Sequence, residues 1–174
     1  MTISRERTDI LDTLRKHREL FRYTAQGLSD EQAATRTTAS ELTVGGLVKH
    51  VTKVERQWAR FVVDGPGESN IDWENVDWSN PPAEMLEHAA SFQMQDATLA
   101  ELLDDYAEAA AATDALVESV DLDADHELPA APWNPPGTRW SARRVFLHVV
   151  AETSQHAGHA DIIRESIDGQ KSMG

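Results

Sequence analysis

The 174-residue sequence predicts an all-α fold, a four-helix bundle with long crossover connections. Four long segments place apolar residues three, four and seven positions apart, which is the spacing of one helical face. No segment has the alternating pattern of a half-buried strand, and there is no internal repeat. Two of the joins between the segments are long and rich in proline and glycine, as in bundles whose helices are connected by crossovers.

The four helices are expected over residues 4–27, 43–64, 98–120 and 141–168. Thr98 and Glu101 have the spacing of a capping box, which fixes the start of the third helix. Ser141 is a favourable N-cap for the fourth helix, and Gly169 is a favourable residue just beyond its end.

The joins are polar. A short helical turn is expected after Ser29, and a short helix near residues 83–90. Connections of the length of 65–97 and 121–140 are often functional lids. Each carries two tryptophans, which either wall a pocket or seal an end of the bundle: Trp73, Trp78, Trp133 and Trp140.

Size and composition narrow the class of protein. The length predicts one domain, residues 1–174. Thirty acidic against sixteen basic residues give a net charge of −14, which disfavours nucleic acid and anionic membrane surfaces as partners. Cysteine is absent, which excludes disulfides, cysteine–zinc sites and a protein thiol nucleophile. Because the sequence has no apolar signal segment and no run long enough to span a membrane, we expect a cytoplasmic protein. We expect it to be a monomer or a homodimer.

The fourth expected helix carries polar residues on its apolar face. His148, Glu152, His156 and His159 fall within an arc of roughly 80° at 100° per residue. A lone inward histidine is usually a hydrogen-bonded core residue. Four such groups on one stripe instead favour a metal, because burying them unpaired would cost several kcal/mol.

Three residues are the predicted metal ligands. Glu152 and His156 are four positions apart and can reach one ion, and His50 lies at the edge of the apolar face of the second helix. Zn²⁺ held by three protein ligands keeps one position open, which is the catalytic arrangement. His148 and His159 are either ligands or residues that line the pocket and support the ligands.

Glu55 also falls within the apolar face of its helix. It either orients a ligating histidine through a hydrogen bond or forms a salt bridge with an arginine of a neighbouring helix, and the salt bridge is slightly favoured.

Two segments carry a family resemblance, LTVGGLVKHV at 42–51, with Glu55 following, and AETSQHAGHADIIR at 151–164. Over most of its length the chain resembles the DinB-like superfamily of metal-dependent helical bundles. Many members use a histidine of the second helix and a His-x-x-x-His pair of the fourth. Here Glu152 stands in place of the first histidine of that pair. This variant is similar to the actinobacterial branch that contains mycothiol S-transferases and mycothiol-dependent maleylpyruvate isomerase.

The resemblance implies a divalent-metal-dependent thiol S-transferase used in detoxification. It would conjugate a low-molecular-weight thiol, mycothiol, to an electrophile through a metal-bound thiolate. Zn²⁺ is the expected ion, although His₂Glu ligation suits several metals. Arg139, Arg143 and Arg144, at the mouth of the fourth helix, are candidates for binding the carboxylate or sugar hydroxyls of the thiol. Arg143 and Arg144 are equally plausible as surface residues of an acidic protein.

Two other functions agree with the same residues. A mycothiol-dependent isomerase would use the same metal and return the thiol unchanged. A metal-binding stress or structural protein would hold a fully coordinated ion without turnover. The sequence identifies no catalytic protein residue beyond the ligands, and it does not identify the electrophile.

Overall fold

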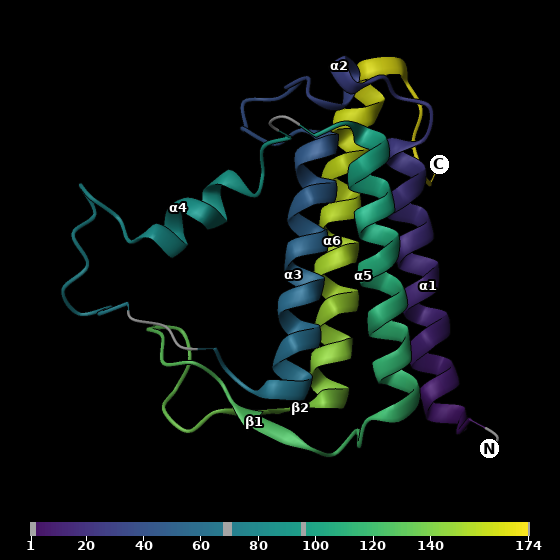
Figure 1. Ribbon diagram of the computed structural model, residues 1–174. Helices are drawn as coiled ribbons and strands as arrows, with labels where there is room; N and C mark the ends of the chain where they lie inside the picture. Colours follow the sequence, from purple (N-terminus) through teal and green to yellow (C-terminus); the bar gives the residue numbers. More distant parts are fainter. Residues whose placement is uncertain (1–2, 68–70, 95–96, 174) are drawn as a thin grey trace.

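The fold is described from a computed structural model, in which residues 3–67, 71–94 and 97–173 are placed. The long helices of this part are α1 (Arg5–Ala25), α3 (Val44–Asp64), α5 (Leu99–Ser119) and α6 (Ala142–Asp168). They pack side by side as a bundle (Figure 1), which confirms the predicted all-α class. Each observed helix begins and ends within two residues of its expected bounds.

The helix ends are set by the capping residues that the sequence predicts. Thr98 and Glu101 form a reciprocal capping box at the start of α5. The Ser141 hydroxyl accepts a hydrogen bond from the backbone N–H of Arg144, and Gly169 ends α6 with a left-handed φ of 79°. Ser29 caps α2 (Asp30–Ala33), the short turn expected there.

The direction of the helices explains the long connections. Figure 1 shows α1 and α6 running one way and α3 and α5 running the opposite way, with α6 packed against both α1 and α3. Because α3 and α5 are parallel, the chain must return along the bundle between them. That distance is about 31 Å for the 21 residues of α3. The described part of this return, residues 71–94, is called the crossover arm here, and it contains α4 (Ala83–Ala90).

The structure also contains a small sheet, although no segment of the sequence has the alternating pattern of a strand. β1 (Asp125–Glu127) pairs antiparallel with β2 (Arg139–Ser141), with His126 opposite Trp140. Three residues are too few to show an alternating pattern, so sequence periodicity could not reveal these strands. The pair closes the connection that leads into α6.

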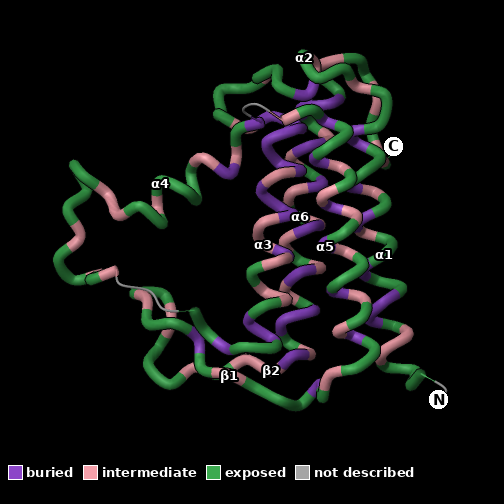
Figure 2. Tube along the Cα trace, in the orientation of Figure 1, coloured by how far each residue is buried: buried purple, intermediate pink, exposed green. Residues whose placement is uncertain are grey.

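The core lies between the four long helices. Figure 2 shows buried residues on their facing sides, whereas the described residues of α4 include no buried one. The largest fully buried apolar side chains come from all four helices and include Phe21, Leu47, Tyr106 and Phe146. No helix in the described ranges has the length and apolar character that crossing a lipid bilayer requires.

The crossover arm returns to the bundle at a glycine. A Cβ added to Gly46 would lie 1.8 Å from the carbonyl oxygen of Phe92. Glycine in a helix costs about 1 kcal/mol relative to alanine, but here it lets the arm lie directly on α3. This contact brings Ser91 and Phe92 to His50, one turn further along α3.

The two long connections also touch each other. The indole N–H of Trp73 donates to the carbonyl oxygen of Ala130 at 3.0 Å, and the Trp73 and Trp133 ring centroids are 4.8 Å apart. Trp133 and Trp78 remain mostly exposed. Trp140, the fourth tryptophan of these connections, instead packs on the bundle against Trp58 of α3.

Candidate metal centre

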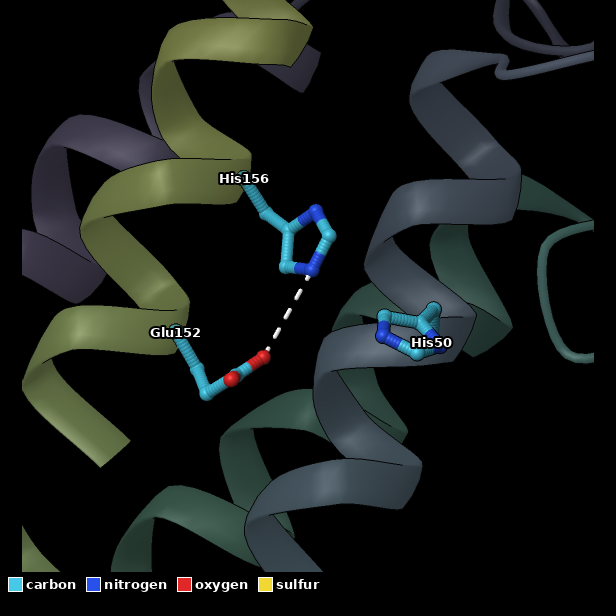
Figure 3. A group of neighbouring side chains, drawn as sticks. All are labelled: His50, Glu152 and His156. Atoms are coloured by element: carbon cyan, nitrogen blue, oxygen red, sulfur yellow. Dashed lines mark ion pairs between the residues drawn. The ribbon is translucent and has the colours of Figure 1, made fainter. Parts of the chain in front are cut away.

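His50 of α3 and Glu152 and His156 of α6 converge on one point (Figure 3). One potential ligand atom from each lies within 4.8 Å of those of the other two. The Nε2 atom of His156 is 3.6 Å from a carboxylate oxygen of Glu152. The four-residue spacing puts both α6 side chains on one face, and the packing of α3 against α6 brings His50 opposite them.

The crossover arm fixes the orientation of His50. The Phe92 ring stacks on the imidazole with centroids 3.7 Å apart, and Ser91 Oγ lies 2.9 Å from His50 Nδ1. The Ser91 hydroxyl donates its one proton to the carbonyl oxygen of His88 at 2.6 Å. It must therefore accept from Nδ1–H of His50, which leaves the Nε2 lone pair of His50 free for a ligand.

His156 has a comparable arrangement. Its Nδ1 lies 3.4 Å from Nδ1 of His159, while its Nε2 faces Glu152. His148 lies on the other side, with its Nε2 3.4 Å from the second oxygen of Glu152. The two histidines whose roles the sequence left open thus flank the converging group, and each contacts one of its members.

The local charges favour the protonation states that bind a cation. Burial lowers the pKa of the His50 imidazole to about 4; His156, His88 and Lys53 also lower it, and Glu152 opposes them. The polar contact with His156 lowers the pKa of the Glu152 carboxyl. At neutral pH His50 is therefore a neutral imidazole and Glu152 an ionised carboxylate, the forms in which these residues bind metals.

The low pKa of His50 gives a testable pH dependence. The unfolded chain takes up a proton at His50 near pH 6.5, whereas the folded chain does so only near pH 4. Stability of the metal-free protein should therefore fall as the pH drops from 6.5 to 4, by up to about 3 kcal/mol from this residue. Urea unfolding with a chelator at several pH values measures it. The same loss in His50→Gln would contradict the assignment.

Glu55 lies in a different cluster. It forms a buried ion pair with Arg18 of α1, and Arg18 Nη1 also lies 2.7 Å from Asp114 of α5. This is the neighbouring-helix salt bridge that the sequence favoured, and Glu55 is not a member of the His50–Glu152–His156 group.

The three predicted arginines have different surroundings. Arg139 pairs with Asp125, and Arg143 pairs with both Glu6 and Asp123. Arg144 instead lies over the indole of Trp140, with its guanidinium carbon 4.1 Å from the ring centroid.

No sequence pattern indicated that Ser91, Phe92 and His88 lie close to His50. The His88 ring centroid is 5.3 Å from that of His50. All three lie in or next to α4, and no periodic pattern links that short helix to α3. The Gly45–Gly46 pair at the start of α3, which is buried in the structure, was the one available signal, because glycine allows another backbone to approach closely.

Cavity size does not single out the centre. A cavity of about 1030 Å³ lies between α1 and α5, and another of about 700 Å³ lies between Trp73 and residues 127–137. Neither is lined by His50, Glu152 or His156, so the candidate centre rests on its converging ligand atoms.

The fold and this group define a helical-bundle protein with a candidate divalent-metal centre between two of its helices. The mycothiol S-transferase family model matches residues 9–169, and the chain belongs to this family. This match confirms the resemblance to the mycothiol S-transferase branch that the sequence indicated.

A solved structure shows the same fold. It is a crystal structure of a conserved protein from Enterococcus faecalis, with a TM-score of 0.63 and 19% identity over 94% of this chain and 97% of that one. No curated protein sequence matches the chain.

Proposed function

We propose that this protein is a divalent-metal-dependent thiol S-transferase that joins mycothiol to an electrophile. The observation that carries the proposal is the convergence of His50, Glu152 and His156 in a member of the mycothiol S-transferase family. Membership of the family supports mycothiol as the thiol and S-transfer as the reaction. The converging donor atoms support a bound divalent metal.

The donor set suits a divalent cation. Two imidazole nitrogens and one carboxylate oxygen are common Zn²⁺ ligands, and three protein ligands leave a position for a substrate. The side chains of His50, Glu152 and His156 would hold the ion. A divalent cation bound there lowers the pKa of a thiol that reaches it, so that the thiol reacts as thiolate at neutral pH.

The other residues of the site keep the ligands in place. Ser91 and His159 hold the Nδ1 sides of His50 and His156, so that both rings turn Nε2 toward the carboxylate. Phe92 covers one face of His50 and excludes water from it. Since the chain has no cysteine, the sulfur nucleophile must come with the cosubstrate.

The reaction is tested with protein purified without a histidine tag. Metal content is measured first, and mycothiol is then mixed with monobromobimane, a neutral electrophile that loses bromide as the carbon–sulfur bond forms. We expect consumption of both reactants above the uncatalysed rate, loss of that rate after chelation and recovery with Zn²⁺. Metal-replete protein with no rate would contradict the transferase and favour a binding protein. In a separate incubation with an isomerisable substrate, conversion of that substrate with mycothiol recovered unchanged would favour an isomerase.

Ser91 should affect metal affinity without contacting the ion. In Ser91→Ala the Nδ1–H of His50 loses its acceptor, and the ring is free to take the wrong tautomer or orientation. Loss of such an outer hydrogen bond typically weakens metal binding about 10- to 100-fold. Zn²⁺ competition with a chromophoric chelator measures this change. Ser119→Ala, at an exposed α5 serine, is the matched control, and equal affinity in the two variants would refute the role of Ser91.

A further inference from the structure

We propose that Arg144, held against Trp140, binds the sugar and cyclitol hydroxyls of mycothiol, at the end of the thiol furthest from its sulfur. This inference rests on the proposed function and adds a binding residue for the thiol cosubstrate.

Of the three arginines at the mouth of α6, Arg139, Arg143 and Arg144, only Arg144 has no carboxylate partner in the part of the chain that the structure describes. Among the described residues no ion pair within 4.0 Å involves it, whereas Arg139 and Arg143 are each held by acidic side chains. The chain has 30 acidic and 16 basic residues, so a carboxylate partner for an exposed arginine would be easy to provide. The donors of Arg144 are therefore available to a ligand.

The aromatic residues next to Arg144 restrict its side chain. Its guanidinium lies on Trp140, and Trp140 stacks on Trp58 with ring centroids 4.9 Å apart and an interplanar angle of 17°. A guanidinium held on an aromatic face keeps the N–H groups at its edge free for hydrogen bonds. Because the side chain is already ordered, binding a ligand costs less conformational entropy.

The position of Arg144 links it to the candidate centre. Arg144, His148, Glu152 and His156 follow one another at four-residue steps along α6. The His148 ring lies 4.8 Å from Trp58 and 5.0 Å from Trp140, and its Nε2 is 3.4 Å from Glu152. The eight residues from Arg144 to Glu152 rise about 12 Å along the helix.

This separation and the donors of Arg144 match the chemistry of the cosubstrate. In mycothiol an acylated cysteine is joined to a sugar and a cyclitol, so that neutral hydroxyl groups lie far from the sulfur. With the sulfur at the centre, an extended molecule along this face of α6 brings its rings toward Arg144. The paired N–H groups of a guanidinium can donate to two adjacent hydroxyl oxygens.

The test compares two thiols in the Arg144→Met variant, which keeps a long side chain over Trp140 and removes the N–H donors. With monobromobimane as a neutral electrophile, the KM for mycothiol should rise about 10- to 100-fold at unchanged kcat. The KM for N-acetylcysteine, which lacks both rings, should not change. Arg5→Met removes an exposed guanidinium of α1 and serves as the matched control.

Calorimetric binding of S-methyl mycothiol gives a readout without turnover, and its Kd should rise by the same factor in Arg144→Met. With an active wild-type protein, any of three results for Arg144→Met would overturn the inference. These are an equal change of KM for both thiols, an unchanged Kd for S-methyl mycothiol, or a smaller rise in the KM for mycothiol than Arg143→Met causes. Wild-type protein that neither conjugates mycothiol nor binds its S-methyl derivative would instead overturn the proposed function, and the inference with it.

Discussion

Replacing Glu152 by alanine is expected to lower Zn²⁺ affinity by more than about 100-fold and to abolish metal-dependent conjugation, while the bundle stays folded. The variant loses a negatively charged ligand, and even partners outside the ligand shell contribute 10- to 100-fold to metal affinity. The side chain is only half-buried, so water can fill its place without a large loss of stability. Metal content after dialysis, together with the circular-dichroism spectrum, measures both parts of this expectation.

The matched control is Glu165→Ala, because Glu165 lies on the same helix, is exposed and is not a member of the converging group. It should keep full metal content. Full occupancy in Glu152→Ala would show that His148 or His159 completes the ligand set in place of the carboxylate.

Replacing Glu55 by alanine should have the largest effect on stability, a loss of about 3 kcal/mol and a fall in Tm of about 10 °C. Glu55 and Arg18 are both buried, and the variant leaves the guanidinium of Arg18 with Asp114 as its remaining acidic partner. Thermal and urea unfolding measure the loss.

An exposed pair provides the comparison. Arg36 and Glu41 form an ion pair on the surface, so Glu41→Ala should cost less than about 1 kcal/mol. Zn²⁺ affinity of Glu55→Ala should remain that of the wild type. A variant of normal stability that binds Zn²⁺ weakly would show that Glu55 acts on the candidate centre instead.

The helices could be predicted from the sequence because their evidence is local. The capping box of Thr98 and Glu101 and the stop at Gly169 depend on residues within one or two turns. The pair Glu152 and His156 is equally local, since a four-residue spacing places both on one face of any helix.

The rest of the site depends on contacts between distant parts of the chain. Ser91 meets His50 across 41 positions, and Arg18 meets Glu55 across 37. Helical periodicity shows that Glu55 faces inward, but the partner it finds there depends on which helices pack together. The short sheet was missed for a related reason, because the pairing of β1 with β2 comes from the closure of a loop.

The location of two of the three converging residues on α6 has a consequence for how the protein is made. A growing chain leaves the ribosome from its N-terminus, so α1, α3, the crossover arm and α5 can begin to fold before α6 is available. Until then His50 stands without Glu152 and His156, which are about 100 positions further along the chain. An ion bound by all three residues can therefore be loaded only after α6 has been synthesised and packed against α3. A nascent chain or a fragment that ends before α6 would offer one of the three side chains and would compete poorly for the metal of the cell.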